Sequence, residues 1–396
     1  MAEKKEKPKE SEESTPEKKE KESDSRQNTN TSAFIVGIAI VAIVVLVYAY
    51  GTITGGSLFG EGKNTQNVIK VGFMGPLTGD AASYGHAIKR GVALALKDSG
   101  VENVEIIYED TKCDGKEAVS AVRKLIDVDG VVAIVGEVCS GATLAAAPIA
   151  EQNKVVMISA SSTSPEITKA GEYIFRTIPS DSFQGKFGAA LVFSEGFRNL
   201  SILFSNEEYG IGFKNVLREN FELLGGQVVA EETFERGVVD LRTQLAKIRA
   251  AKPDAIYIIS NSPDSSVALL KQLKQMGIKT RVFGSEGLKG PEIAALKAAQ
   301  GLTITSVSAG TKSFADAYMR EHGLEVQPFA PQAYDAFDAL ARAIKSDAKT
   351  GPDIQKQLTT LQFDGASGSI DFDEQGDVSG TYEVYRLQNN TFVLVE

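Results

Sequence analysis

From Val68 onward, short apolar runs alternate with longer segments whose apolar residues recur at helical spacing. The runs VIKVGFMG, VEIIYED, VVAIVG and KVVMISA predict four buried strands, and helices are expected between them near 85–100, 115–130 and 141–151. Short apolar strands that alternate with helices form parallel sheets covered on both faces. The pattern therefore predicts an α/β fold.

The same alternation restarts after FRTIPSDSFQG, the sequence of residues 175–185. The runs LSILFS, GQVVAEETF, AIYIIS and RVFGSEG predict strands, separated by helices at about 209–223, 238–250 and 263–276. After LTITSV, two more helices are predicted in SFADAYMREHG and APQAYDAFDALARAIKS, and the chain from residue 368 is strand-like. Two successive series of this kind indicate two lobes of similar build.

The first 67 residues follow a different pattern. Residues 1–31 hold eight Lys or Arg and nine Asp or Glu with almost no apolar side chain, which predicts a disordered charged arm. Eighteen uncharged residues then run from 33 to 50, long enough to cross a bilayer as a helix. We therefore expect a transmembrane anchor over 32–52 and a flexible tether over 53–67.

A cleaved signal peptide is the alternative for this apolar run. Signal peptides have a shorter apolar region after a brief basic start, whereas this run follows a 31-residue charged arm. An uncleaved anchor is therefore favoured. The distribution of basic residues weakly places the N-terminus inside, so a single-pass protein with its folded part on the extracellular or periplasmic side is expected.

Charge and motifs exclude several functions. A net charge of −10 argues against nucleic acid as a partner. The chain has no GxxxxGK(S/T) loop, and no GxGxxG opens a predicted helix, so no nucleotide cofactor is expected. Its two histidines, His86 and His322, lie in no catalytic or metal motif, so neither a bound metal nor an enzyme activity is expected.

Polar side chains follow the strands at the turns where ligands bind in open parallel sheets. Hydroxyls dominate the first series, as in CSGAT around Ser140 and SASSTSPEIT after the fourth strand. In the second series, Glu286 lies in GSEGL, next to Gly287. Free N–H groups and hydroxyls at a helix start suit a carboxylate, and a carboxylate suits a cation. Ordinary helix caps and a solvated loop acid are the alternative interpretations of these residues.

The chain from Ile69 to about Val384 resembles the branched-chain-amino-acid-binding proteins, which are type I solute-binding components of ABC importers. The resemblance rests on the following stretches, in this order: IKVGFMGPLTGDAASYG, DTKCDGKEAVSAVRKLI, VGEVCSGAT, MISASSTSPEIT, FRTIPSDSFQG, EEYGIGF, GSEGL and IDFDEQGD. It implies two Rossmann-like lobes joined by a three-crossover hinge. The first lobe would comprise 68–180 and 308–364, and the second 181–307 and 365–396.

The resemblance also implies roles for individual residues. Ser140 matches the position whose hydroxyl and N–H bind a ligand's α-carboxylate, and Thr163 matches a threonine that also serves the α-groups. Ser161 matches a position that offers backbone groups. Glu286 matches the acid that pairs with the α-ammonium from the other lobe. Cys113 and Cys139 match the two halves of a family disulfide, which is implied by the resemblance alone.

The expected pocket walls differ in part from those of relatives. Tyr84 and Tyr209 match aromatic wall positions, but Asn261 stands where relatives often have an aromatic residue. Before Tyr334 the usual aromatic is replaced by a smaller run, FAPQ. These differences predict a preference for a small or polar ligand over leucine.

The implied function is capture of an amino acid by hinge closure and its delivery to ABC permease subunits, by a monomer that needs no cofactor. A sensory ectodomain with the same fold is one alternative, and a protein that binds a short amide or urea-type solute is another. The 31-residue arm contains no signalling module, which favours delivery.

Overall fold

The computed structural model describes residues 68–395, which belong to one compact unit. The charged arm, the membrane anchor and the tether expected from the sequence lie outside the described residues. Among the described residues, no helix is long and apolar enough to cross a membrane.

The first lobe is built on a five-stranded parallel sheet in the order β2-β1-β3-β4-β5. Its strands are β1 (Ile69–Gly75), β2 (Val104–Asp110), β3 (Ala133–Val135), β4 (Val156–Ser159) and β5 (Ile174–Arg176). All residues of β3 and β4 are buried, as expected of parallel strands covered on both faces. The helices of this lobe are α2 (Ala82–Ser99), α3 (Gly115–Arg123), α4 (Ser140–Gln152), α10 (Lys312–His322), α11 (Ala330–Lys345) and α12 (Gly351–Leu358).

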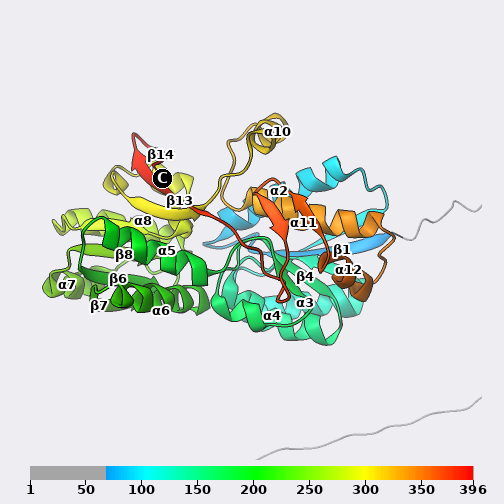
Figure 1. The fold of residues 1–396 in the computed structure, drawn as a ribbon, viewed down its shortest axis with the longest axis horizontal. Helices are drawn as coiled ribbons and strands as arrows, with labels where there is room; N and C mark the ends of the chain where they lie inside the picture. Colours follow the sequence, from blue (N-terminus) through cyan, green and yellow to red (C-terminus); the bar gives the residue numbers. More distant parts are fainter. Residues whose placement is uncertain (1–67, 396) are drawn as a thin grey trace, which may run out of the picture. The chain divides into compact units, whose positions relative to one another are not determined.

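The second lobe contains a seven-stranded sheet in the order β14-β13-β10-β9-β8-β6-β7. Strands β6 to β10 are parallel, whereas β13 runs antiparallel to β10 and β14 antiparallel to β13. The strands are β6 (Asn199–Ser205), β7 (Gln227–Phe234), β8 (Ala255–Ile259), β9 (Arg281–Gly284), β10 (Thr303–Val307), β13 (Tyr382–Gln388) and β14 (Thr391–Leu394). Its helices are α5 (Asp181–Ser194), α6 (Glu208–Leu223), α7 (Arg242–Ala251), α8 (Pro263–Gln275) and the short α9 (Pro291–Ala294). In Figure 1 this lobe lies on the left and the first lobe on the right.

Helix ends follow local chemistry. Helix α8 begins where the Ser262 hydroxyl accepts the N–H of Ser265 and Pro263 occupies the first turn. Helix α2 ends at Gly100, which has a φ of 64° and therefore adopts the left-handed conformation that glycine tolerates best. Helix α8 begins shortly after β8, so the turn between them lies at the carboxyl end of that strand.

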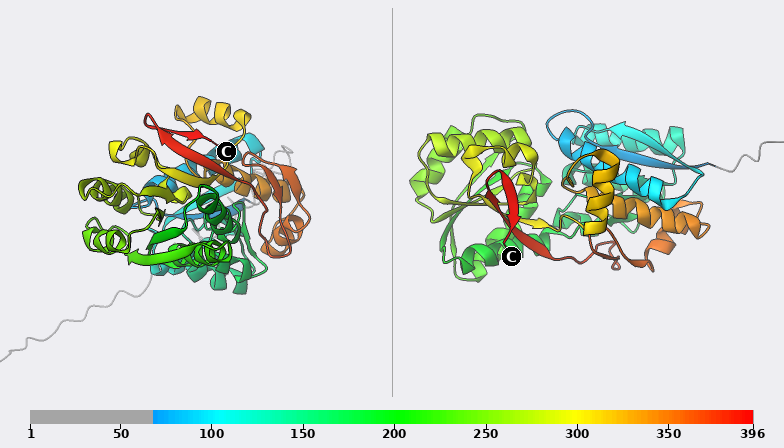
Figure 2. Two further views of the ribbon diagram at one scale, coloured as in Figure 1. Left: turned by 60° about the vertical axis from the view of Figure 1, so that its left-hand side comes forward. Right: turned by 90° about the horizontal axis from the view of Figure 1, so that it is seen from above.

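The chain passes between the lobes in three segments of the described residues, visible from above in Figure 2. They follow β5, β10 and β12 (Ser369–Asp371). Arg176, at the end of β5, is fully buried, and its Nε and Nη2 donate to the Asp377 carboxylate at 2.6 Å each. Because Arg176 and Asp377 lie just before the first and third crossings, this pair ties the starts of two of the three hinge segments together.

The structure confirms the alternation of strands and helices but adds elements that the pattern did not predict. Strand β5 and helices α5 and α12 were not expected. Helix α5 contains two glycines, which weaken its intrinsic helical signal. At Gly188 a side chain would lie 2.7 Å from the Tyr257 hydroxyl oxygen, so tertiary packing rather than propensity selects this residue.

The expected return to the second lobe at residue 365 differs from the observed packing. Strand β12 pairs with β11 (Gln362–Asp364). Ile370, Phe372 and Val378 are buried in the first lobe's core cluster, and Phe372 packs edge-on against Phe175. The chain therefore leaves the first lobe after Val378, because apolar side chains beyond residue 365 complete that lobe's core.

Candidate functional site

Ser140 is the first residue of α4 and is 2% exposed. Its Oγ accepts the N–H of Ser164 at 3.2 Å, which leaves its own O–H as a donor. Glu137 orders the preceding turn, since its Oε2 accepts the N–H groups of Val138 and Cys139 at 2.7 Å each. The free N–H groups of the first turn of α4 make this end of the helix favourable for an anion.

Two further predicted residues lie in the loop after β4. Ser161 donates its hydroxyl to the carbonyl of Val138 at 2.7 Å, which links this loop to the turn before α4. Thr163 is 1% exposed, and its hydroxyl has no hydrogen-bond partner among the described residues. Its carbonyl accepts the N–H of Asp181 at 2.8 Å, at the start of α5.

Glu286 enters the site from the second lobe, in the 3-10 turn Glu286–Leu288 after β9. It is 4% exposed, and burial raises the pKa of its carboxyl to about 7. Gln184 donates its Nε2 to Glu286 Oε2 at 2.5 Å. Gly287 follows because a side chain there would meet the carbonyl oxygen of Ser260 at 2.1 Å, so only glycine lets this turn approach β8.

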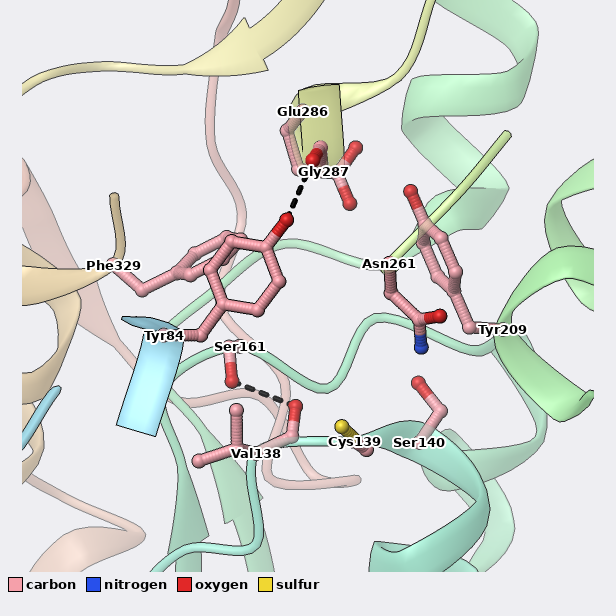
Figure 3. A pocket seen from close by; sticks show the side chains of 10 residues that line it. All are labelled: Tyr84, Val138, Cys139, Ser140, Ser161, Tyr209, Asn261, Glu286, Gly287 and Phe329. Atoms are coloured by element: carbon pink, nitrogen blue, oxygen red, sulfur yellow. Dashed lines mark hydrogen bonds between the residues drawn. The ribbon is translucent and has the colours of Figure 1, made fainter. Parts of the chain in front are cut away.

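These residues from both lobes line one small pocket of about 30 Å³ (Figure 3). The lining residues are Tyr84, Val138, Cys139, Ser140, Ser161, Tyr209, Asn261, Glu286, Gly287 and Phe329. Of the seven ligand-binding residues expected from the sequence, six line it. Thr163 does not, although it lies in the loop that supplies Ser161.

Aromatic side chains close the pocket on the side of Tyr84. Its hydroxyl donates to the carbonyl of Gly287 at 2.6 Å, across the two lobes, and its ring lies edge-on to Phe329 with centroids 5.7 Å apart. On the other side, the Tyr209 hydroxyl donates to Ser285 Oγ at 2.7 Å. Because the Tyr84 bond joins the two lobes, the structure shows the cleft in a closed arrangement.

Asp181 is a buried acid near this site that sequence reasoning missed. It is fully buried at the start of α5, and neither carboxylate oxygen has a hydrogen-bond partner among the described residues. Burial raises the pKa of Asp181 well above its usual value, and the nearby Glu286 raises it further. The available signal was the acid in PSDSFQG, where a serine followed by an acid is typical of a helix start.

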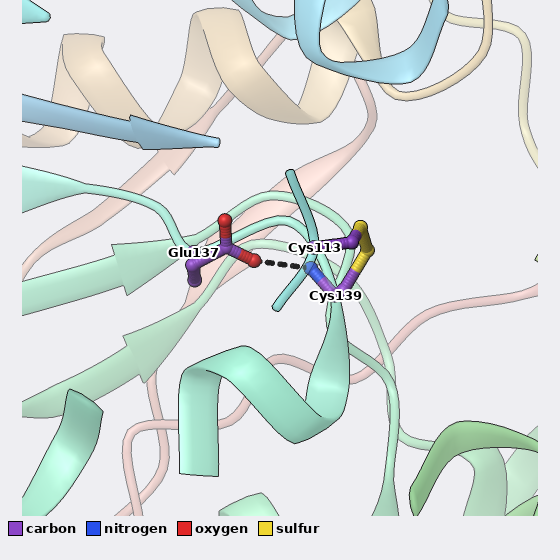
Figure 4. Close-up of side chains that lie close together, drawn as sticks. All are labelled: Cys113, Glu137 and Cys139. Atoms are coloured by element: carbon purple, nitrogen blue, oxygen red, sulfur yellow. Dashed lines mark hydrogen bonds between the residues drawn. A yellow bond between two sulfur atoms is a disulfide. The ribbon is translucent and has the colours of Figure 1, made fainter. Parts of the chain in front are cut away.

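Cys113 and Cys139 form the expected disulfide, with Cα atoms 5.4 Å apart (Figure 4). Their sulfur atoms and a Glu137 carboxylate oxygen lie within 4.8 Å of one another, a grouping that could otherwise suggest a metal site. Sulfurs joined in a disulfide are not thiolates, and thiolates are the form of cysteine that binds metals. The cluster is therefore a structural support for the turn that carries Ser140.

We expect replacement of both cysteines by serine to lower the free energy of unfolding by about 3.5 kcal/mol, because the bridge closes a loop between residues 26 apart. Denaturant titration of the variant and wild type would measure this difference. Peptide mapping without reductant should recover the two cysteines as one linked pair, and free thiols in natively isolated protein would contradict the bridge.

The chain is similar in sequence to known solute-binding proteins. A model of the periplasmic binding protein family matches residues 68–391. The leucine-, isoleucine-, valine-, threonine-, and alanine-binding protein of Pseudomonas aeruginosa is 31% identical over 330 residues, which cover 79% of this chain and 87% of that protein.

Two solved structures share the fold at similar identity. A leucine binding protein from Thermotoga maritima is 30% identical with a TM-score of 0.79, over 83% of this chain and 98% of that one. The branched-chain amino acid transporter substrate binding protein of Streptococcus pneumoniae, solved with isoleucine, is 29% identical with a TM-score of 0.76, over 83% and 99%. The expected two-lobed fold and family resemblance are confirmed.

Proposed function

The chain belongs to the periplasmic binding protein family, together with the Leu/Ile/Val-binding proteins, and we propose that it captures an amino acid between its lobes for an ABC importer. One observation carries this proposal. Ser140, at a helix start of the first lobe, and Glu286, a buried acid of the second, line the same pocket. A zwitterionic amino acid has a carboxylate for the helix start at Ser140 and an ammonium group for Glu286.

The carboxylate of the ligand would bind at the first turn of α4. There, N–H groups without helical partners and the positive end of the helix dipole favour an anion. The Ser140 hydroxyl adds a donor, since its oxygen already accepts the N–H of Ser164. Ser161 and Thr163 would complete this end from the adjoining loop.

The ammonium group would bind at the acidic end of the pocket. Glu286 lines it, and the buried acid Asp181, whose raised pKa reflects burial and the nearby Glu286, is a second group that a bound cation would favour in its ionised form. Two desolvated acids repel each other, and a bound cation relieves that repulsion. The ligand would contact Ser140 and Glu286 together only when the lobes close, so its binding would favour the closed state.

The walls favour an amino acid with a small side chain. Tyr84 and Phe329 close one side of a cavity of about 30 Å³, and Tyr209 forms part of another wall. Asn261 contributes a polar amide whose Oδ1 is buried without a partner among the described residues. An amide or urea-type solute is a second candidate, because a Glu286 with a pKa of about 7 is partly uncharged near neutral pH.

The apolar run of residues 33–50 would serve as a single-pass anchor that keeps the binding unit near permease subunits on the extracellular or periplasmic side. Protease added to intact cells should remove the folded unit. Protection of that unit until the cells are lysed would contradict this topology.

A ligand screen tests the proposal. Scanning calorimetry of the full-length protein, with each of the twenty amino acids, acetamide and urea, should show a raised melting temperature for at least one amino acid. Ligand at 1,000 times its Kd stabilises the native state by about 4 kcal/mol. A shift with acetamide or urea and with no amino acid would contradict an amino-acid function.

Ser140→Ala should weaken binding of the best amino acid by about 1 to 3 kcal/mol, which is about 5- to 150-fold. The loss is limited because the N–H groups of the helix start remain. Titration calorimetry measures it. Ser194→Ala is a matched control, because Ser194 ends α5 outside the pocket and its hydroxyl bonds only the Leu191 carbonyl among the described residues. Equal affinities for the two variants would remove Ser140 from the site.

A further inference from the structure

Arg236 reaches from the second lobe to the first. It lies between β7 and α7, in a turn held to its own lobe by the N–H of Gly237, which donates to Ser262 Oγ at 3.2 Å. From this turn, Arg236 Nη1 donates to the carbonyl of Cys113 at 3.2 Å. It does not line the pocket, so its contact joins the lobes at a place separate from the pocket.

The carbonyl that accepts this bond is part of a cross-linked unit. Cys113 is bonded to Cys139, the residue before Ser140, through the disulfide. Two residues before Cys113 in the same loop, the Thr111 hydroxyl donates to the Glu137 carboxylate. The other oxygen of that carboxylate accepts the N–H of Cys139. The loop held by Arg236 and the turn that begins α4 therefore move together.

The charge of Arg236 also faces buried acids. Glu137 of the first lobe is fully buried, and burial raises the pKa of its carboxyl to about 7, while the positive charge of Arg236 opposes that rise. Arg236 acts in the same direction on Glu207 of its own lobe. Separation of the lobes would remove the guanidinium from Glu137 and break its bond to Cys113.

We propose that Arg236 is an interlobe latch, a positioning residue that stabilises the closed state and slows ligand release without touching the ligand. This inference rests on the proposed capture by closure. A contact made in the closed state and broken on opening shifts the opening equilibrium toward closure, in the free protein as well as in the complex, and apparent affinity rises in proportion to the closed fraction. The latch acts on the side of the pocket where the disulfide anchors Ser140.

Arg236→Gln in the full-length protein should raise the Kd for L-alanine or L-leucine by about 5- to 30-fold, as expected for loss of one partly exposed, charge-assisted hydrogen bond. The weaker binding should come from faster dissociation of the ligand. The association rate should be nearly unchanged, because the bond forms after the ligand has entered. Stopped-flow tyrosine fluorescence measures both rates. Arg236→Lys, which keeps the charge, should recover part of the affinity.

Arg242→Gln is the matched control. Arg242 is exposed and pairs with Asp240 of its own lobe at 3.1 Å, so its loss should change neither rate. In a protein that lacks Cys113 and Cys139, both replaced by serine, Arg236→Gln should have a smaller effect, because the acceptor loop is no longer tied to α4. Equal dissociation rates in Arg236→Gln and wild type would overturn the proposal.

Hydrogen exchange distinguishes a failure of the proposed amino-acid function from a failure of the latch. If the wild type binds none of the twenty amino acids, hydrogen exchange of the ligand-free protein still reports on the latch. Arg236→Gln should then speed amide exchange in residues 111–113 and 235–238, relative to Arg242→Gln. Unchanged exchange in both loops would overturn the latch independently of any ligand.

Discussion

Glu286→Gln should weaken binding of the best amino acid by about 2 to 5 kcal/mol, which is about 30-fold to several thousand-fold. The substitution keeps the shape of the side chain and its hydrogen bond with Gln184, but removes the negative charge that would face the ammonium. The large effect follows from burial, because the ligand cation would lose its ionic partner where water cannot replace it. Titration calorimetry at pH 8 measures the change directly.

Glu286→Gln should also alter the pH dependence of the Kd. In the ligand-free protein the pKa of Glu286 is raised to about 7, whereas a bound ammonium favours its ionised form. Below pH 7, binding must therefore release a proton, and the Kd should rise by up to about tenfold per unit as the pH falls. Glu286→Gln should lose that part of the dependence and keep any part due to Asp181. An unchanged affinity at pH 8 would indicate an uncharged ligand in the same cleft.

The second large effect is on stability. Asp377→Ala should lower the free energy of unfolding by about 3 to 5 kcal/mol and the melting temperature by about 5 to 10 °C. The reason is that Arg176, fully buried, would lose both charged hydrogen bonds and remain in the interior without a counter-charge. Denaturant and thermal unfolding measure the change.

Asp316→Ala is the matched control for this prediction. Asp316 forms an exposed pair with Lys312 on α10, at 2.9 Å, and exposed pairs contribute about 0 to 1 kcal/mol. Asp377→Ala should thus be clearly less stable than Asp316→Ala. Equal stabilities would mean that the buried pair does not hold the two hinge segments together.

The sequence predicted those parts of the site that depend on local order. Ser140 follows a buried strand and begins a helix, and Glu286 follows another strand, so both could be placed at the edges where ligands bind. The strands themselves were predicted because their short apolar runs differ from the helical spacing of the segments between them. These features need only residues close to one another along the chain.

Other residues depend on packing between distant segments. Phe329 lines the pocket from a left-handed conformation, with a φ of 66°, at the start of α11, and its contact with Tyr84 spans 245 positions of sequence. Arg236 meets Cys113 across the two lobes, from a position 123 residues away in the sequence. Neither residue has a local signal that distinguishes it from an ordinary core aromatic or surface arginine. Such contacts follow from the tertiary fold, which is why the sequence pattern did not indicate them.

A crystal structure of the protein with the amino acid that raises its melting temperature most tests the central claim directly. We expect the ligand between closed lobes, with its carboxylate at the Ser140 hydroxyl and the N–H groups of α4, and its ammonium within hydrogen-bond distance of Glu286. A ligand bound outside the pocket, or one whose charged groups contact neither Ser140 nor Glu286, would contradict the account.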